Sequence, residues 1–183
     1  MKVTGIVRKL DDLGRVVIPK EIRRTMRIRE GDPLEIYTSR EGEVIFKKYS
    51  PIGELSEFAS QYAETLYKTC GLSVLISDRD AVIAAAGVSK REYLEKTLSE
   101  GVENIIEGRS LYVYRDGGEK YSPITDGGSH FVRCAMPIIS EGDVVGCVAT
   151  VWDGSEKGSA PDREIETKLI MTAAGFLGRQ LEI

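Results

Sequence analysis

Side chains that build metal centres and disulfide frameworks are scarce in this sequence. It has a single histidine, His130, and three cysteines, Cys70, Cys134 and Cys147, which stand in apolar surroundings and not at the spacing of metal ligands. A zinc site and a disulfide framework are therefore not expected, and we interpret the cysteines as reduced core thiols. No metal or other cofactor is predicted.

Long apolar runs are missing as well. The longest, 81–88 and 144–152, are far too short to cross a bilayer, and the first residues, MKVTGIVRKLDD, lack the apolar stretch of a signal peptide. We therefore expect a cytoplasmic protein with no membrane partner. Hydrophobic residues make up 42% of the chain and charged residues 30%, a balance typical of a folded globular protein and not of a disordered one.

The residue groups that mark an enzyme are also absent. The one histidine has no nucleophilic motif such as G-x-S-x-G around it, and the pairs Asp11/Asp12 and Asp78/Asp80 are better explained by the turn propensity of aspartate. No catalytic residue is predicted, and we do not expect an enzyme.

Charge is present in quantity but unevenly distributed. Residues 1–50 contain 12 Lys or Arg against 8 Asp or Glu, a net charge of +4, whereas residues 51–183 have a net charge of −8. A basic module followed by an acidic one indicates a polyanion partner for the first module only. We place the two domains at 1–50 and 51–183, with a short linker of turn composition at 49–53 (YSPIG).

The basic module begins with the pattern of a β-hairpin. Residues 6–10 (IVRKL) and 15–18 (RVVI) are β-type runs, and DDLG between them has turn composition. A register in which paired residue numbers sum to 23 would place Arg8 opposite Arg15, which costs stability unless a bound anion offsets the repulsion. One residue of slip would separate the two arginines, so the register stays open.

A short helix and a second hairpin follow. Pro19 suits the first helical position, because its φ is helical and its missing N–H is not needed there. The helix is predicted over 20–27 (KEIRRTMR), and the turn 29–32, in which Gly31 favours a left-handed conformation, ends it. Alternating apolar residues predict the second hairpin from 34–38 and 44–48.

A module of this size is marginal as a monomer. One short helix and four short strands bury little surface, and such pieces usually need metal, disulfides or oligomerisation. Because the segment has no Cys or His, we expect it to intertwine with a second copy. The dimer would present its arginines as a two-fold symmetric set suited to pseudo-palindromic DNA.

One long motif fills residues 4–37, which read TGIVRKLDDLGRVVIPKEIRRTMRIREGDPLEIY, and its most distinctive run is GRVVIPKEIRR. The motif closely resembles the DNA-binding domain of the AbrB-like transition-state regulators. The resemblance implies a swapped-hairpin dimeric β-barrel that binds double-stranded DNA. The family's DNA-contacting arginines match Arg8, Arg15, Arg23 and Arg24, with Lys9 adjacent. Arginine suits this role because its planar fork can bridge phosphates or read guanine.

An antitoxin of similar fold is an alternative for the first module, and it would also bind DNA. The toxin-binding tail of an antitoxin should be short and disordered, whereas the remaining part of this chain is neither.

Residues 51–183 have the pattern of an α+β domain around an antiparallel sheet. Apolar periodicity and capping residues predict helices over 54–69, 89–99, 100–107 and from Pro161 to about 181. Strands are expected at 72–77, 81–86, 111–115, 130–139 and 144–152.

The closing strand pair of this domain reads AMPIISEGDVVGCVAT over residues 135–150. It resembles the closing hairpin of GAF domains, and the element order agrees, although PAS-like sensors share this architecture. Taken with the first module, nearly the whole chain resembles a family of two-domain sporulation regulators. That resemblance implies a transcription factor that activates some genes and represses others.

A GAF-like domain raises the question of a small-molecule ligand, whose identity stays open. The candidate ligand-binding residues are Arg109, Tyr112, His130 and Arg133. The alternative is that these are ordinary surface or core residues, because no phosphate loop or cofactor motif accompanies them.

The last predicted helix is apolar on two sides. The two stripes are Ile165, Leu169, Ala173 and Phe176, and Ile170, Ala174, Leu177 and Leu181. One side can pack on its own sheet, and the other could meet the helix at 54–69 and equivalent helices of another subunit. We therefore predict a tetramer built from two dimers.

Two functions follow from these patterns. The first is a sequence-specific transcriptional regulator whose second domain receives a signal. The second is a low-specificity architectural DNA-binding protein whose second domain is only an oligomerisation scaffold.

Overall fold

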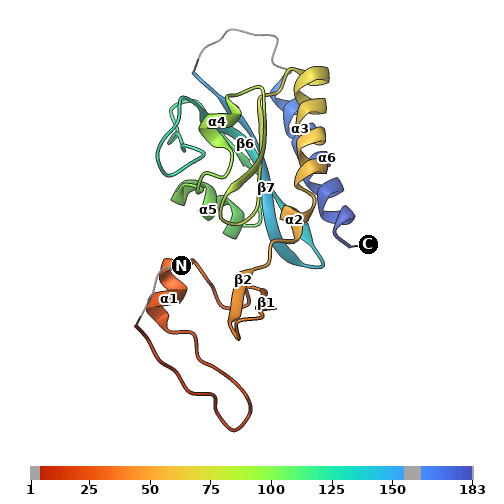
Figure 1. The fold of residues 1–183 in the computed structure, drawn as a ribbon. Coiled ribbons are helices and arrows are strands. Elements are labelled where there is room, and N and C mark those ends of the chain that lie inside the picture. The colour runs from red at the N-terminus through yellow and green to blue at the C-terminus, as the bar shows by residue number, and fades with distance from the viewer. Residues whose placement is uncertain (1–4, 155–161, 183) are drawn as a thin grey trace. The chain divides into compact units, whose positions relative to one another are not determined.

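The structure, a computed structural model, describes residues 5–154 and 162–182. The chain divides into two compact units, Met1–Tyr49 and Ser50–Ile183 (Figure 1). Within the described ranges no helix is long and apolar enough to span a membrane.

The first unit contains one helix and one two-stranded sheet. Helix α1 spans Lys20–Thr25, and strands β1 (Leu34–Thr38) and β2 (Val44–Lys48) pair antiparallel with Ile36 opposite Phe46. The predicted second hairpin is therefore confirmed. The described part of the single chain forms no closed barrel, since the expected barrel would need the strands of two copies.

The predicted first hairpin is not formed in the single chain. Its two runs are not strands but the limbs of a long loop, residues 5–19, which we call the arm (Figure 1). A tight turn closes where the Asp11 N–H donates to the Arg15 carbonyl at 3.0 Å, so Arg8 does not lie opposite Arg15. The register summing to 23 is therefore wrong for this chain. A two-stranded ribbon without apolar cover is marginal in water, and Val7 and Val17 are 85% and 71% exposed.

Helix α1 begins and ends differently from the prediction. Pro19 is the N-cap with ψ 148°, outside the helix, and Arg27 ends it early by adopting a left-handed φ of 52°. The Ile28 N–H then donates to the Arg23 carbonyl at 2.7 Å, the bond of a Schellman motif. The helix thus ends about one turn before Gly31, the residue that was expected to end it, although Gly31 also has a left-handed φ.

The second unit is an α+β domain around a five-stranded antiparallel sheet, as predicted. Its strands, in the spatial order β4-β3-β7-β6-β5, are β3 (Val74–Ser77), β4 (Val82–Ala86), β5 (Tyr112–Val113), β6 (Phe131–Ser140) and β7 (Asp143–Trp152). Its helices are α2 (Pro51–Glu54), α3 (Ser56–Cys70), α4 (Lys90–Tyr93), α5 (Glu100–Glu107) and α6 (Arg163–Gln180). The Pro161 at which the last helix was expected to begin lies outside the described residues.

The helices form a layer on each face of this sheet (Figure 1). On one face α2, α3 and α6 bury a core that includes Ile76 and Val148, and on the other α4 and α5 bury a core that includes Leu75 and Val82. Leu75 and Ile76 face opposite cores because successive side chains of a strand point to opposite faces. Burial raises the pKa of the Cys134 thiol to about 11 and that of Cys147 to about 12, which fits reduced core thiols.

The predicted linker 49–53 is only partly a linker. Ser50 caps α2 by accepting a hydrogen bond from the Gly53 N–H at 3.2 Å, and Ile52 is fully buried in the core beside α3. Ser50 also donates to the Asp78 carboxylate at 3.1 Å. Asp78 in turn accepts from the backbone of the turn between β3 and β4, which confirms its interpretation as a turn residue. The second unit is thus anchored from its first residues.

The helix predicted at 89–99 is mostly wrong. Only Lys90–Tyr93 is helical, because Leu94 is extended and Glu95 has a left-handed φ of 61°. The chain then makes isolated β-bridges through Thr97 and Leu98. By contrast, the helix predicted at 100–107 is confirmed as α5.

Candidate nucleic-acid interface

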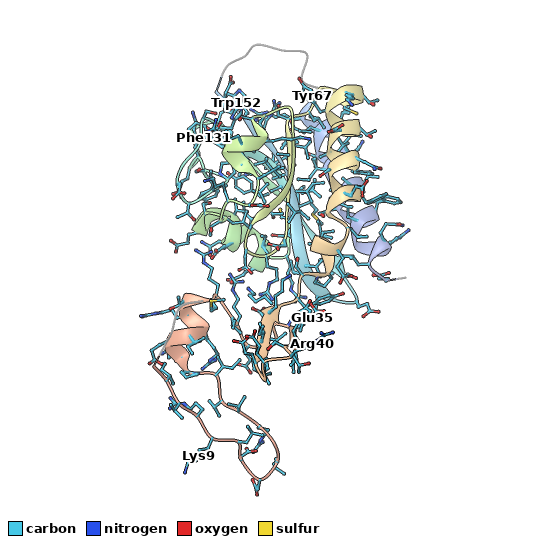
Figure 2. All side chains as sticks on the ribbon, viewed as in Figure 1. Lys9, Glu35, Arg40, Tyr67, Phe131 and Trp152 are labelled. Atoms are coloured by element: carbon cyan, nitrogen blue, oxygen red, sulfur yellow. The ribbon has the colours of Figure 1, made fainter. Side chains whose placement is uncertain are left out.

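The arm carries three of the five predicted DNA-contacting side chains. Arg8 and Lys9 are exposed, and the only polar contact of Arg8 with the residues that the structure describes is a long 3.4 Å hydrogen bond to the Val7 carbonyl. Figure 2 shows the Lys9 side chain on the outside of the arm. Arg15 is 68% exposed and forms an ion pair with Asp11 at 2.8 Å. The arm therefore presents cations to solvent with one internal carboxylate partner.

Helix α1 carries the other two. Arg23 and Arg24 occupy its last turn, where cations interact favourably with the helix dipole, and both are exposed. No ion pair holds either guanidinium within residues 5–154 and 162–182. Both are therefore available to an external anion.

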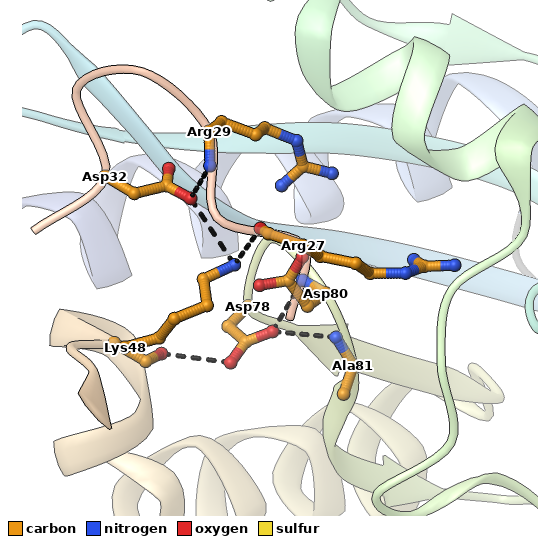
Figure 3. Close-up of polar contacts among 8 residues, drawn as sticks. Arg27, Arg29, Asp32, Lys48, Asp78, Asp80 and Ala81 are labelled. Atoms are coloured by element: carbon orange, nitrogen blue, oxygen red, sulfur yellow. Dashed lines mark hydrogen bonds and ion pairs between the residues drawn. The ribbon is translucent and has the colours of Figure 1, made fainter. Parts of the chain in front are cut away.

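A polar anchor holds the segment that follows α1 to strand β2 (Figure 3). The Lys48 ammonium donates to the Arg27 carbonyl at 2.8 Å and pairs with the Asp32 carboxylate at 3.4 Å, and Asp32 accepts from the Arg29 N–H at 2.8 Å. The Asp32 side chain is 4% exposed, so this pair is protected from solvent screening. Sequence reasoning missed Lys48 and Asp32, because nothing in their spacing distinguishes them from other charges of a turn and a strand.

Apolar side chains of the first unit lack cover in the single chain. Helix α1 buries no residue completely, and the strands leave Ile36 and Val44 61% and 59% exposed. Leu10 and Leu13 in the arm are exposed to a similar degree. Such a surface is incomplete until another protein surface covers it.

In the second unit, the four candidate ligand-binding residues do not converge. Arg109 donates to the Gly142 carbonyl at 2.7 Å at the β6–β7 turn. The Tyr112 hydroxyl donates to the Glu119 carbonyl at 3.3 Å, and partial burial of the side chain raises the pKa of Tyr112. Each of the two is held by its own partner.

The other two residues of that set lie in separate networks. His130 Nδ1 lies 3.0 Å from the Tyr93 hydroxyl and 2.9 Å from the Ser129 hydroxyl, and Ser129 donates to the Glu92 carboxylate. Arg133 instead pairs through Nε with Glu166 of α6 at 3.0 Å. Sequence reasoning missed Glu166, although a signal existed, since an acid in line with the apolar stripe of a helix is expected to be buried and paired.

Two protein families match different parts of the chain. Residues 54–182 match the family described as "Stage V sporulation protein T C-terminal, transcription factor", and residues 7–53 match the family described as "Antidote-toxin recognition MazE, bacterial antitoxin". Stage V sporulation protein T of Bacillus subtilis is 51% identical over 184 residues, which is 100% of this chain and 99% of that protein. The transition state regulatory protein AbrB of the same organism is 43% identical over 101 residues, 55% of this chain and 88% of that protein.

Solved structures resemble each unit separately. The N-terminal DNA recognition domain of Bacillus subtilis AbrB is 63% identical and covers 28% of this chain and 94% of its own, with a TM-score of 0.25. A GAF domain from A. aeolicus nlh2 is 18% identical and covers 68% of this chain and 82% of its own, with a TM-score of 0.50. The second likeness identifies the GAF fold and no more.

Two findings lead to the same conclusion: the family match over residues 54–182 and the relative that is 51% identical over the full chain. This chain belongs to the stage V sporulation protein T family of transcription factors.

Proposed function

We propose that this protein is a sequence-specific DNA-binding regulator of sporulation genes, activating some and repressing others, and that its first unit binds the DNA. The observation that carries the proposal is the set of exposed cations on the arm and α1, of which only Arg15 has a carboxylate partner among the described residues. A relative's domain that is 63% identical is described as a DNA recognition domain. Exposed cations are what phosphate and base contacts require.

The uncovered apolar residues of the first unit support a dimer as the binding species. A second copy would cover Val7, Leu10 and Val17 of the arm by pairing it into a swapped-hairpin barrel. The paired arms would then bring two copies of Arg8 and Arg15 to one duplex, which suits a pseudo-palindromic site. The protein would act in the cytoplasm by binding and not by catalysis.

Alanine substitutions test the DNA-binding surface. Replacing Arg8, Arg15, Arg23 or Arg24 should weaken specific binding by about 1–3 kcal/mol where the side chain reads a base. Lys9→Ala should weaken binding to all DNA sequences evenly. It should also lower the slope of log affinity against log salt concentration by about 1, as expected of a phosphate contact. Lys68→Ala in α3 is a charge-matched control outside the first unit, and it should leave the affinity unchanged.

Affinities are measured with the full-length protein, a specific and a random duplex, and several salt concentrations. If all four arginine substitutions left DNA affinity unchanged, the proposed surface would be wrong.

A low-specificity architectural protein is the second candidate. The observation that favours it is that Arg109, Tyr112, His130 and Arg133 each have an internal partner, as they would in a scaffold without a ligand. The same titrations separate the two functions, because a regulator typically keeps a specific-to-random ratio of roughly a thousand or more at physiological salt. An architectural protein would lose nearly all of its affinity as salt rises.

The second unit is proposed to join two dimers into a tetramer. Phe58 and Tyr62 of α3 and Phe176 of α6 form one aromatic cluster, with ring centroids 5.9 Å apart for Phe58 and Phe176 and 5.6 Å for Tyr62 and Phe176. Phe176 remains 40% exposed, so the cluster is incomplete in the single chain. Equivalent helices of another subunit would complete it.

A further inference from the structure

The turn of the arm holds an acidic residue in the middle of the basic surface. Asp11 lies four residues before Arg15, and both of its carboxylate oxygens are used. Oδ1 accepts from the backbone N–H of Leu13 at 3.0 Å and of Arg15 at 2.8 Å, whereas Oδ2 accepts from Arg15 Nε at 2.8 Å. One oxygen thus shapes the turn and the other orients the guanidinium.

The contact through Nε leaves the opposite edge of the guanidinium open. The Arg15 side chain is 68% exposed, and among the described residues nothing accepts a hydrogen bond from its terminal Nη1 and Nη2. A pair of parallel N–H groups can contact O6 and N7 of guanine bidentately. Asp11 therefore holds Arg15 by the nitrogen that such a contact does not need.

Asp11 stays ionised while it does this. The backbone hydrogen bond from Arg15, and then its side-chain hydrogen bond, hold the pKa of Asp11 below its ordinary value. An unpaired carboxylate in this place would instead repel DNA phosphates.

We propose that Asp11 is a positioning residue for sequence reading: it fixes Arg15 through Nε so that the Nη1 and Nη2 edge meets one base pair, and so sets the preference at that base pair. This inference rests on the proposed function, because it needs Arg15 to contact DNA. An arginine held in its binding geometry loses less conformational entropy on forming a specific contact. An arginine without this support would meet phosphates and bases with less discrimination.

Asp12 provides a matched control in the same turn. It is exposed, and its side chain forms no hydrogen bond or ion pair with the described residues. Asp11→Asn and Asp12→Asn each remove one negative charge from the turn and should raise non-specific attraction alike. Asn at position 11 keeps an oxygen for the backbone of the turn but turns an amide N–H₂ toward Arg15 Nε, so it removes the guanidinium contact selectively.

The experiment uses the full-length protein and a duplex that the wild type enriches from a random library, with a scrambled duplex of equal composition. The quantity measured at fixed salt is the dissociation constant for the scrambled duplex divided by the dissociation constant for the enriched duplex. Asp11→Asn should lower this ratio roughly ten-fold and relax the preference at the base pair that Arg15→Ala relaxes. Asp12→Asn should keep the ratio within about two-fold, and Asp11→Asn should add nothing in the Arg15→Ala background.

Two outcomes overturn the inference alone, provided that the wild type is sequence-specific. One is that Asp11→Asn and Asp12→Asn change the ratio equally. The other is that Asp11→Asn changes the ratio further when Arg15 is already alanine. If the wild type enriches no sequence, the proposed function fails and the inference falls with it. Arg15→Lys keeps the charge but lacks the planar fork, so it should relax the same base pair even if Asp11→Asn folds poorly. Relaxation at a different base pair would contradict the inference.

Discussion

Arg133 and Glu166 illustrate at the scale of single residues how a candidate ligand-binding group forms an ion pair with a buried carboxylate. The Glu166 side chain is 3% exposed on α6, and it meets both the Arg133 guanidinium and the Thr150 hydroxyl from the sheet. A buried carboxylate is tolerated only when its charge is paired and its oxygens accept hydrogen bonds. Arg133 is therefore better explained as the partner of Glu166 than as a free ligand-binding group.

Breaking this pair should destabilise the second unit strongly. Arg133→Met removes the only cation paired with Glu166 within the described residues, and losing one member of a buried pair costs about 3–5 kcal/mol. Replacing both residues by apolar ones, Arg133→Met with Glu166→Leu, should recover most of the loss. Urea denaturation gives the free energy of unfolding for each variant.

The exposed pair Arg163–Asp116 serves as the control for that prediction. Its side chains are 51% and 82% exposed, so Arg163→Met should change the free energy of unfolding by about 1 kcal/mol or less. A loss in Arg163→Met as large as that in Arg133→Met would contradict the role given to burial.

At the scale of elements, helix α6 contains two glycines that differ in how closely they pack against the rest of the second unit. A Cβ at Gly178 would collide with the Ile139 backbone of β6, whereas a Cβ at Gly175 would meet nothing within 4 Å. The sequence places both in an apolar helix and does not tell them apart. Only the packing of α6 on the sheet separates a glycine required for close approach from one that is not.

Alanine at these two positions should therefore act in opposite directions. Gly178→Ala should destabilise the second unit by about 1–3 kcal/mol, because the helix must move away from β6. Gly175→Ala should stabilise it by about 0.5–1 kcal/mol, because Ala is the better helix former. Thermal unfolding of the two variants, three residues apart on α6, measures the contrast. A gain for both would show that α6 is not packed closely on β6.

Other elements show where local patterns succeed and fail. Helices α3 and α5 and strands β1 and β2 were predictable, because their apolar residues repeat at the helical or the strand period. Strands β6 and β7 were predictable because two apolar runs flank a turn. The helix expected at 89–99 ends after Tyr93, where Leu94 is extended, and its Glu92 accepts from the Ser129 N–H at 2.8 Å instead of completing a capping box. A tertiary partner 37 residues away decided between two uses of the same side chain.

At the scale of the whole molecule, incomplete apolar surfaces mark both units. The arm lacks cover in the first, and the α3–α6 aromatic cluster lacks it in the second. Two separate self-associations are consistent with a tetramer built from two dimers. Each should then be removable without the other.

Phe176→Glu should divide the proposed tetramer into dimers that still bind DNA, because burying an unpaired charge in the aromatic cluster costs free energy. Leu111→Glu is the control: Leu111 is 36% exposed, close to the 40% of Phe176, but lies outside the α3–α6 cluster. Light scattering should show half the wild-type mass for Phe176→Glu and the full mass for Leu111→Glu. A stable monomer of wild type at micromolar concentration would contradict both associations.

The sequence by itself determined the properties that depend on composition and local order. The uneven charge, the distinctive run GRVVIPKEIRR and the periods of the main helices and strands were sufficient for the fold class, the family and the candidate arginines. These properties need no long-range contact, because charge and periodicity are local.

Only the tertiary structure decided how individual side chains are used. It paired Arg133 with Glu166, brought Gly178 against β6, and gave Arg15 to Asp11 instead of placing it opposite Arg8. The physical reason is that each of these outcomes depends on burial or on a partner set by the fold of the backbone. A charge run read along the chain shows how many cations there are, but only the folded turn shows that Arg15 has Asp11 as its carboxylate partner.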